Sequence, residues 1–504
     1  MRVYRVSDHR LFDIDGHRFL FLVDESAIYE VEPDTAETLR RWSGAAPFAK
    51  DAFTSGLSGP EAERQELVAD LVARRVLRPA GGENAPAAIP DSCPAAMPRH
   101  PSPCPGERPE AGRDGLDPAA VPLQTLVLHV TDACNLACLY CYRAATPGAK
   151  QARGPMSART GRAAIDFLLD RSGPLKEVVL VFFGGEPFLN LDLVSEAAAY
   201  ARDQAGRLGK TVQFAVTTNG TLLTPEALSL IEEYSIGVTV SIDGLPETQD
   251  RNRPFAGGAP SYAAMLPGLK ALLRPGGGKP VVARVTVSGD PGELPRILDH
   301  LLELGFAEVG FAPATTRDPR CQLQARDLEL LLGQFQSLTD AFLEHAGQDR
   351  FLGFSNLVDL LVTLHEGEVR DYPCGAGLGL FSADPQGRLF LCQRLTGQES
   401  TCMGDVFRGF DSARVARWRE EVLRDRREEC RDCWVRRICA GGCYHEALVR
   451  AGGLTRPNRH YCRWIQEWVR IGLEAYGRLA LRRPEYLERL SCLRGHPTAF
   501  PIPV

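Results

Sequence analysis

The sequence predicts an α/β protein with three parts: a central parallel sheet covered by helices, a small domain before it and a cysteine-rich domain after it. Six β-prone runs alternate with helical runs between residues 126 and 312, which is typical of parallel strands joined by helices. Three closely spaced cysteines follow the first of these runs directly, and cysteines become frequent again after residue 373.

Composition favours several soluble globular domains and excludes some partners. The chain of 504 residues is 44% apolar and 24% charged, which is ordinary for about three domains. A net charge of −6 leaves no basic footprint, so we expect neither nucleic acid nor a membrane surface as a partner. With no signal-like or membrane-spanning apolar run, we expect a cytoplasmic protein, in which the fifteen cysteines act as metal ligands or catalytic thiols.

Residues 1–80 are expected to form a small sheet followed by helices. Helical stretches are predicted near Asp34–Trp42 and Glu61–Arg75, and Asp15-Gly16 lies between the first two β-prone runs, where a hairpin could turn. The β-prone runs are Val3–Val6, Phe19–Val23 and Ile28–Glu32.

Residues 81–122 are expected to be a linker. They are rich in proline, alanine and glycine and cannot bury enough apolar surface to offset the entropy of ordering. Cys93 and Cys104 lie in this segment and are interpreted as incidental.

The central domain, residues 123–345, is predicted from alternating runs. The strands are expected at Leu126–Val130, Val178–Phe183, Val212–Thr217, Gly237–Ile242, Val281–Val287 and Glu308–Ala312. The helices are expected at Ala158–Asp170, Leu191–Ala205, Pro225–Glu233, Tyr262–Leu273 and Glu293–Leu304, with a further helical stretch around Arg326–His345.

Cys134, Cys138 and Cys141 are the first residues that indicate a chemistry. Their C-x₃-C-x₂-C spacing, on a loop just after a strand, suits three irons of a [4Fe–4S] cluster, because thiolates are the preferred ligands of such clusters. The fourth iron would have no protein ligand. The alternative is a zinc knuckle, but no fourth cysteine or histidine follows Cys141 at zinc-finger spacing.

This spacing, followed by Tyr142, resembles the signature of the radical S-adenosylmethionine (radical SAM) superfamily. The resemblance implies that the open iron binds the amino and carboxylate groups of S-adenosylmethionine and reduces it to a 5′-deoxyadenosyl radical. It also implies a partial (β/α)₆ TIM-like barrel, with active residues just after the strand C-termini.

A glycine-rich segment follows the second expected strand. By the same resemblance, Gly184, Gly185, Glu186 and Pro187 should grip the methionine amino group of S-adenosylmethionine. Glycine lets the backbone approach a ligand closely, and a carboxylate complements an ammonium group.

Further contacts to S-adenosylmethionine are implied by residues that follow the other strands. Tyr140 should lie by the adenine, Asn219 and Ser241 are candidates for nucleoside or carboxylate contacts, and Arg284 is a candidate for the methionine carboxylate. For Asp243, Asp250 and Arg253, turn formation and loop salt bridges are at least as strong an interpretation as ligand contact.

The C-terminal cysteines resemble the SPASM domain, named for subtilosin, pyrroloquinoline quinone, anaerobic sulfatase and mycofactocin maturation. Seven thiols and Gly387 match its pattern, within an expected domain at residues 346–476. The resemblance implies two auxiliary [4Fe–4S] clusters. One would be held by Cys430, Cys433, Cys439 and Cys462, and the other, the first auxiliary cluster, by Cys374, Cys392 and Cys443.

The first auxiliary cluster lacks an obvious fourth ligand. The sulfatase-maturing branch has an eighth cysteine six residues before the equivalent of Cys374, where this chain has Glu368. Cys402, Cys321, a substrate thiol or no group at all could take that place. A substrate thiol bound to iron would be deprotonated and held close to the radical.

The two ends of the chain carry weaker signals. Residues 1–80 resemble the winged-helix-like peptide-recognition domain of peptide-modifying enzymes, in which a leader peptide adds a strand to the sheet edge. A structural cap without a ligand is the alternative. Trp464–Tyr486 should form one or two amphipathic helices, and residues 477–504 are expected to hold the end of that helix and a tail.

The predicted function is that of a radical SAM maturase acting on a ribosomally made peptide or a small protein subunit, by forming thioether cross-links from cysteine. The run Cys392–Gly397 leading to Met403–Val406 resembles the maturation enzymes of quinohemoprotein amine dehydrogenases, which link cysteine sulfurs to Asp and Glu side chains. Formylglycine formation, as in anaerobic sulfatase maturases, is the alternative, and an iron–sulfur scaffold or redox sensor is an alternative of another class. A flavodoxin-, ferredoxin- or reductase-type electron donor is expected, and no general base is assigned.

Overall fold

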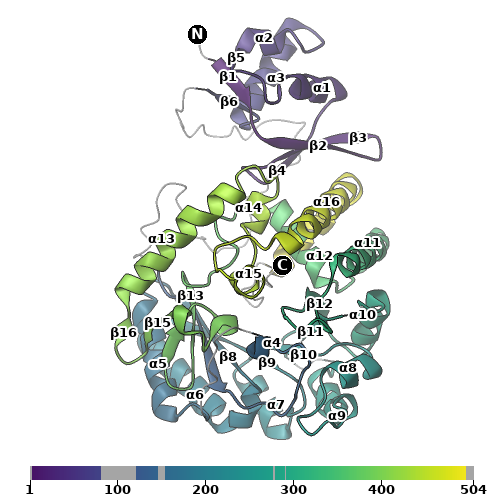
Figure 1. The fold of residues 1–504 in the computed structure, drawn as a ribbon. Coiled ribbons are helices and arrows are strands. Elements are labelled where there is room, and N and C mark those ends of the chain that lie inside the picture. Colours follow the sequence, from purple (N-terminus) through teal and green to yellow (C-terminus); the bar gives the residue numbers. More distant parts are fainter. Residues whose placement is uncertain (1–2, 81–120, 146–153, 276–277, 290, 495–504) are drawn as a thin grey trace.

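The computed structural model describes residues 3–80, 121–145, 154–275, 278–289 and 291–494, and Figure 1 shows a small N-terminal domain standing on a larger body. Most of the expected linker, with Cys93 and Cys104, lies outside the described residues. No helix in the described ranges is both long and apolar enough to cross a membrane.

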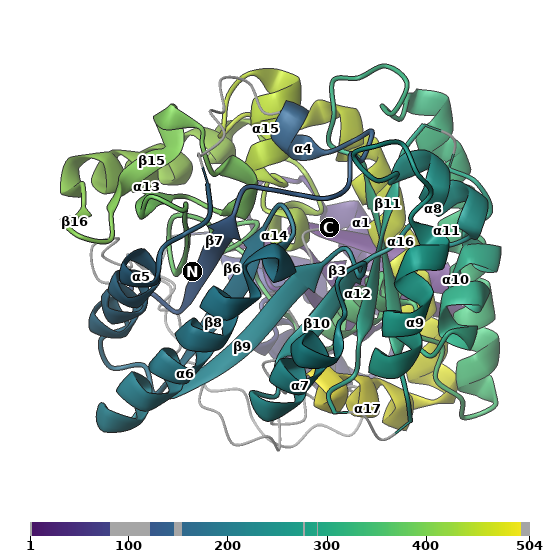
Figure 2. The same cartoon turned by 90° about the horizontal axis from the view of Figure 1, so that it is seen from below.

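The expected partial barrel is confirmed. Its six strands are parallel in the order β12-β11-β10-β9-β8-β7, and the helices cover their outer side (Figure 2). The strands are β7 (Thr125–Thr131), β8 (Glu177–Gly184), β9 (Thr211–Thr218), β10 (Gly237–Ser241), β11 (Val282–Val287) and β12 (Glu308–Pro313). In β10, Val238 and Val240 pack toward the helices, while Thr239 and Ser241 line an internal cavity.

The barrel helices begin where the sequence places good caps. Ser157 accepts a hydrogen bond from the Thr160 amide, and Thr224 accepts one from the Ala227 amide, with Pro225 in the first turn. The helices are α5 (Ala158–Arg171), α6 (Leu191–Arg207), α7 (Pro225–Glu233), α9 (Tyr262–Leu272), α10 (Leu294–Glu303) and α11 (Ala325–Gly347). The short helices α4 (Tyr142–Ala145), η2 (Pro187–Asn190) and α8 (Pro246–Asn252) were not expected.

The cysteine-rich domain continues the barrel sheet. Strand β13 (Leu380–Ala383) pairs in parallel with β7, with Leu380 opposite Thr125, and β14 (Arg388–Phe390), β15 (Cys402–Asp405) and β16 (Gly409–Phe410) add on as antiparallel strands. Because β14 runs antiparallel to β13, it returns the chain toward the start of β7, and Cys392 follows it there. The helices here are α12 (Ser355–His365), α13 (Ser412–Glu429), α14 (Arg436–Cys439), α15 (Tyr444–Ala451), α16 (Arg459–Arg482) and α17 (Pro484–Arg494), with the short helices η3 (Gln393–Leu395) and η4 (Glu399–Thr401).

The expected boundary between residues 476 and 477 falls inside helix α16. This helix stays continuous because its apolar face packs against both α11 and α12. The chain thus forms two helices here, α16 and α17, which is one of the two arrangements expected, and α17 extends beyond Tyr486 to Arg494.

The N-terminal domain contains two small sheets, and the expected single sheet was wrong. Strands β1 (Val3–Val6), β5 (Phe48–Ala49) and β6 (Leu77–Pro79) form one, and β2 (His9–Ile14), β3 (His17–Leu22) and β4 (Ala27–Glu30) form the other. The Asp15-Gly16 turn joins β2 to β3, so it does not follow β1. Sequence reasoning missed β2 because its half-exposed residues lack a continuous apolar run. The helices are α1 (Pro33–Trp42), α2 (Lys50–Thr54) and α3 (Glu61–Ala73).

The β2–β3 hairpin fixes the N-terminal domain to the cysteine-rich domain. Phe21 packs edge-on against Trp434, with ring centroids 6.2 Å apart, and Arg436 pairs with Asp8 at 2.7 Å and with Asp24 at 2.8 Å. Trp434 and Arg436 belong to the segment between Cys433 and Cys439. The N-terminal domain therefore rests on the segment expected to hold the second auxiliary cluster.

Two helical glycines, Gly472 in α16 and Gly333 in α11, allow the packing of α16 on α12 to be tested. A Cβ atom on Gly472 would lie 2.3 Å from Cδ2 and 2.8 Å from Cγ of Leu360, whereas one on the exposed Gly333 of α11 would meet nothing within 4 Å. We expect Gly472→Ala to destabilise the protein by about 1–3 kcal/mol through overpacking, and Gly333→Ala to stabilise it by about 0.5–1 kcal/mol. Thermal unfolding of both variants measures this, and an unchanged Gly472→Ala protein would contradict the packing of α16 on α12.

Candidate active site

A cavity of about 760 Å³ opens at the C-terminal ends of the barrel strands and reaches into the barrel. One wall is the cysteine loop of residues 131–143, and another is formed by the barrel strands. The third comes from the cysteine-rich domain. Its lining includes the expected site residues Cys134, Cys138, Tyr140, Cys141, Gly184, Gly185, Asn219, Ser241, Arg284, Cys430, Cys433, Cys439, Cys443 and Cys462.

The cysteine loop is held from below by backbone hydrogen bonds. The Ala137 amide donates to the Pro254 carbonyl at 2.8 Å, and the Leu139 amide donates to the Asn252 carbonyl at 3.0 Å. Burial raises the pKa of the Cys138 thiol to about 11, and the neighbouring Cys141 and Cys134 act in the same direction. Three thiols that are this close suit an iron cluster, whose positive irons would stabilise their thiolates.

The two glycines of the Gly184–Pro187 segment bring the backbone close to the cysteine loop. The Gly185 amide donates to the Thr131 carbonyl and the Glu186 amide to the Ala133 carbonyl, both at 2.9 Å. A Cβ atom on Gly184 or Gly185 would lie only 2.1 Å from the Thr131 or Ala133 oxygen, respectively. The glycines therefore serve first to seat the cysteine loop, and both also line the cavity.

Glu186 is completely buried and does not line the cavity. Its carboxylate accepts hydrogen bonds from the Thr218 hydroxyl at 2.8 Å, the Asn219 amide at 2.7 Å and the Phe188 amide at 3.2 Å. Burial raises its pKa to about 7, against these donors. The carboxylate thus ties the β8 and β9 ends together, and the direct contact with an ammonium group expected from the sequence stays a prediction. Pro187 is buried at the start of η2.

Asn219 connects the β9 end to the first cysteine. Its Nδ2 lies 3.9 Å from the Cys134 sulfur and donates to Asn135 Oδ1 at 2.9 Å, while its Oδ1 accepts from the Thr221 hydroxyl at 2.6 Å. The amide is therefore fixed in one orientation at the cavity wall. Ser241 also lines the cavity, from the end of β10.

A buried triad of Tyr140, Asp243 and Arg253 was missed by sequence reasoning, which gave turn and loop roles equal weight. The Tyr140 hydroxyl donates to the Asp243 carboxylate at 2.7 Å and accepts from Arg253 Nη1 at 2.9 Å. Arg253 is only 7% exposed and lines the cavity. Although burial disfavours its charge, the nearby Tyr140, Cys138 and Asp243 raise the pKa of Arg253. The sequence signal for this triad is the position of Arg253, which follows strand β10 after one short helix, α8.

Arg284 lies away from the cysteine loop, in the barrel interior. Burial and the nearby Arg394 lower its pKa to about 10, while Asp359 acts in the opposite direction. No hydrogen-bond acceptor in the described part of the chain meets its Nη1. The contact of Arg284 with a methionine carboxylate stays a prediction, and Arg253, the arginine beside Cys138, is a second candidate for it.

The C-terminal thiols form two groups. Burial, with the nearby Cys443 and Cys374, raises the pKa of Cys392 to about 12. Burial also raises the pKa of Cys439 to about 12, with Cys430, Cys462 and Cys433 contributing. The members of each group are those that the sequence analysis expected to share a cluster.

The two spare cysteines lie elsewhere. The Cys402 sulfur, on the outer strand β15, is 3.7 Å from the Gly404 carbonyl oxygen, and Cys321 packs with Tyr140 and Cys138 beside the cysteine loop. Glu368 pairs with Arg370 at 3.2 Å. In the described part of the chain, no three Cys, His, Asp or Glu side chains lie close enough together to hold a single metal ion. The ligands of a four-iron cluster do not need to lie so close, because each binds a different iron.

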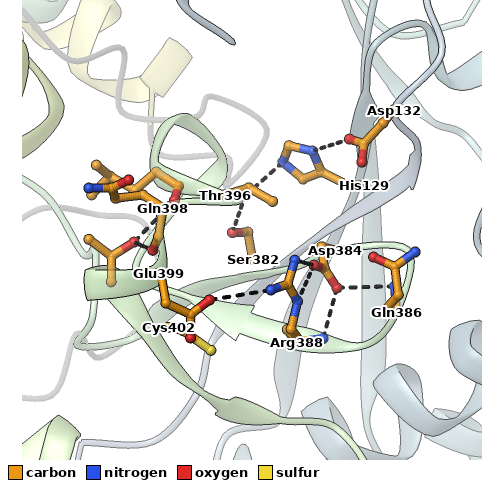
Figure 3. Close-up of polar contacts among 12 residues, drawn as sticks. His129, Asp132, Ser382, Asp384, Gln386, Arg388, Thr396, Gln398, Glu399 and Cys402 are labelled. Atoms are coloured by element: carbon orange, nitrogen blue, oxygen red, sulfur yellow. Dashed lines mark hydrogen bonds and ion pairs between the residues drawn. The ribbon is translucent and has the colours of Figure 1, made fainter. Parts of the chain in front are cut away.

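A polar junction joins the cysteine loop to the segment after Cys392 (Figure 3). His129 lies between Asp132, whose carboxylate is 3.9 Å from Nδ1, and the Thr396 hydroxyl, 3.1 Å from Nε2. Thr396 in turn contacts the Ser382 hydroxyl at 2.7 Å. Burial lowers the pKa of His129, so this link is made by a neutral imidazole. It fixes one cluster loop relative to the other.

Comparison with known proteins assigns the barrel region to a family. Residues 128–304 match the Radical SAM superfamily. Enzymes of this superfamily use a [4Fe–4S] cluster and S-adenosylmethionine, and the cavity with its cysteine loop provides the thiols and the space for both.

Individual relatives cover different parts of the enzyme. An uncharacterized protein of Methanocaldococcus jannaschii is 32% identical over 38% of the chain, which spans 62% of that relative's length. A serine-type anaerobic sulfatase-maturating enzyme of Klebsiella aerogenes is 25% identical over 69% of the chain and 85% of its own length. The subtilosin biosynthesis protein AlbA of Bacillus subtilis is 23% identical over 68% of the chain and 70% of its own length.

Solved structures show the same fold. The anSMEcpe protein with bound AdoMet superposes with a TM-score of 0.62 at 17% identity, over 71% of this chain and 100% of that one. The same protein has been solved with AdoMet and a Cp18Cys peptide. The match extends well beyond residues 128–304, in agreement with a barrel that continues into the cysteine-rich domain.

Gly185 offers a direct test of how the cysteine loop is seated. A methyl group there would collide with the Ala133 carbonyl, so we expect Gly185→Ala to lose the first cluster and S-adenosylmethionine binding, at least tenfold in affinity, while iron bound by the C-terminal thiols remains. Iron analysis and equilibrium binding measure this. Gly206→Ala in α6 is the control, because a Cβ there meets nothing within 4 Å. Normal binding in Gly185→Ala would contradict the role given to this contact.

Glu186 should make stability depend on pH. Its carboxyl group keeps a proton up to a pH of about 7 in the folded chain, but only to near its ordinary pKa of 4.5 when unfolded. The folded state therefore binds more protons in this window, and its stability should fall by about 3 kcal/mol as pH rises from 5 to 8. Chemical unfolding of wild type and Glu186→Gln at each pH isolates this contribution, and parallel curves for the two proteins would refute it.

Proposed function

We propose that the enzyme is a maturase of a ribosomally made peptide or small protein, and that it joins a cysteine sulfur to a carbon atom of another residue. The observation that carries the proposal is the group of Cys374, Cys392 and Cys443. It has three thiols where a cubane needs four ligands, and one of them lines the same cavity as the cysteine loop. A substrate thiol is the fourth ligand that this arrangement favours.

The first auxiliary cluster would have an open ligand position, because the two spare cysteines, Cys402 and Cys321, make contacts elsewhere. Cys402 is turned to the Gly404 carbonyl, and Cys321 is packed against Tyr140 and Cys138, so each has a place in another part of the protein. Glu368, where the sulfatase-maturing branch has a cysteine, is paired with Arg370. The first auxiliary cluster would thus be left with one iron for a ligand from outside the chain.

The residues of the cavity would then have distinct tasks. Cys134, Cys138 and Cys141 would hold the cluster that binds S-adenosylmethionine, and Arg253 and Asn219 would orient its polar groups. When bound, S-adenosylmethionine and this cluster supply a radical that removes one hydrogen atom from a substrate carbon. The shared cavity would keep the bound sulfur near that carbon, which replaces an encounter in solution by a fixed geometry.

The N-terminal domain would bind part of the peptide substrate. Strand β4 pairs with β3 on one side only, within the described sheet, and it lies at the edge opposite β2. A peptide could add to this edge as a further strand, which would hold the substrate chain while its reactive residues enter the cavity. The relatives that act in sulfatase and subtilosin maturation support a peptide or protein substrate. An external reductase, flavodoxin or ferredoxin is the expected electron donor.

Formylglycine formation is the second candidate, because a sulfatase-maturating enzyme is among the relatives with the widest coverage. It would convert a serine or cysteine side chain to an aldehyde and would leave no new sulfur–carbon link. Glu368 and the N-terminal domain favour the thioether reaction over it.

Mass spectrometry of a treated peptide tests the proposal. The enzyme, reconstituted without oxygen, is given S-adenosylmethionine, a reductant and the small cysteine-containing polypeptide encoded beside it. We expect the loss of one hydrogen pair per site, a thiol that no longer alkylates, and fragmentation blocked between two residues. Loss of sulfur with a new aldehyde would establish formylglycine chemistry and overturn the proposal.

Single cysteine variants test the open position in the same assay. We expect Cys374→Ala to abolish cross-linking, while Cys402→Ala and Cys321→Ala keep both cross-linking and the iron of the first auxiliary cluster. Cys492→Ala, on the exposed face of α17, is the control. Loss of first-cluster iron in Cys402→Ala or Cys321→Ala would mean that the chain completes its own cluster.

A further inference from the structure

Arg394 is a half-buried cation that lines the cavity between the two cluster sites, and we propose that it sets the reduction potential of the first auxiliary cluster through its contact with the Cys443 sulfur. The inference rests on the proposed function only in assigning that cluster to Cys374, Cys392 and Cys443. It concerns the residue that follows Cys392 by two positions, in a run that the overall reaction leaves without a role.

The guanidinium group of Arg394 is held at both ends. Its Nη1 lies 3.8 Å from the Cys443 sulfur, and its Nη2 donates to the Thr315 hydroxyl at 2.7 Å. Its central carbon stands 5.8 Å from the centre of the Tyr142 ring, next to Cys141. One side chain therefore contacts a ligand of the auxiliary cluster, the top of the barrel and the cysteine loop.

The local backbone explains why this side chain points inward. Cys392 is followed by the short helix η3, whose first residues, Gln393 and Arg394, both line the cavity. Thr315 follows strand β12 directly and is only 2% exposed, so its hydroxyl is a fixed acceptor. The geometry belongs to the fold and does not depend on a mobile surface contact.

Arg394 carries a permanent positive charge, because a guanidinium group does not lose its proton in proteins. Glu446, on α15, and Arg284, on β11, are charged groups near it. A permanent positive charge thus lies in a low-dielectric region beside a cluster ligand.

A positive charge and a hydrogen bond at a cluster sulfur both favour the reduced cluster, which carries one more negative charge than the oxidised one. In the proposed reaction a thiolate and a carbon radical form one sulfur–carbon bond and release one electron. The auxiliary cluster is the acceptor of this electron. Arg394 would therefore make the acceptor easier to reduce, and it acts as a positioning and tuning residue.

A merely structural arginine would not change the potential of an intact cluster, and this separates the two roles. The full chain with Cys134, Cys138 and Cys141 replaced by alanine, reconstituted without oxygen, keeps only the auxiliary clusters. Potentiometric titration followed by electron paramagnetic resonance gives their midpoint potentials. The signal that disappears in the additional variant Cys374→Ala belongs to the first auxiliary cluster.

We expect Arg394→Met to lower the potential of the first auxiliary cluster by an amount that changes the reduced-to-oxidised ratio at least tenfold, or about 59 mV for one electron. Arg394→Lys keeps the charge and should shift it less. Thr315→Val removes the hydroxyl that orients the guanidinium and should shift it in the same direction by a smaller amount.

The chain offers two control substitutions. Arg388→Met removes a cation of the same hairpin that pairs with Asp384 and Glu399 outside the cavity, and it should leave both potentials unchanged. Gln466 donates to the Cys433 sulfur at 3.5 Å, so Gln466→Leu should move only the second cluster.

An unchanged first-cluster potential in Arg394→Met, with iron content intact, would overturn the inference. If Arg394→Met fails to hold iron, Arg394→Lys and Thr315→Val provide the test instead. Wild-type potentials in both of these variants would also overturn the inference. Because potentials are measured without a peptide, the outcome is separate from whether the enzyme forms thioethers.

Discussion

The parallel pairing of β13 with β7 is the contact on which the site depends. It joins the cysteine-rich domain to the first barrel strand, and antiparallel β14 then returns the chain toward the start of β7. The thiols of the cysteine loop follow the end of β7, whereas Cys392 and Arg394 follow β14 and reach the cysteine loop through side-chain contacts. A chain that only tethered the two domains would leave the distance between their clusters undefined. Here hydrogen bonds of one sheet, and the His129–Thr396 contact above it, fix that distance.

The second constraint is the close approach of the end of β8 to the backbone of the cysteine loop. Gly184 and Gly185 let β8 end directly against the cysteine loop, and the buried carboxylate of Glu186 then joins this end to β9. Neither feature needs to touch S-adenosylmethionine to be required for its binding. A buried, strongly hydrogen-bonded carboxylate costs stability when it ionises, and it is retained where it holds loops in a defined arrangement.

The sequence was sufficient for features with local or repeated signals. The barrel strands are short apolar runs between helices, and their bounds agree with the structure to within one or two residues, as for Val212–Thr217 and β9. The groups of C-terminal thiols followed from spacing and resemblance. Strand β2 could not be found, because only one of its six residues is buried. The continuity of α16 depends on partners from α11 and α12 that are distant in sequence.

The functional residues that sequence reasoning missed share a physical reason. Arg253 and Arg394 are ordinary loop arginines by sequence, and only the fold buries them, beside Cys138 and Cys443, more than a hundred and about fifty residues away. A buried cation is costly unless an anion accompanies it. Yet burial raises the pKa of Cys138 and Cys392 to about 11 and about 12, so that these thiols are neutral partners in the absence of metal. Bound iron would hold these thiols as thiolates, and Arg253 and Arg394 would then lie beside additional negative charge. The positive side chains and the clusters would therefore stabilise each other.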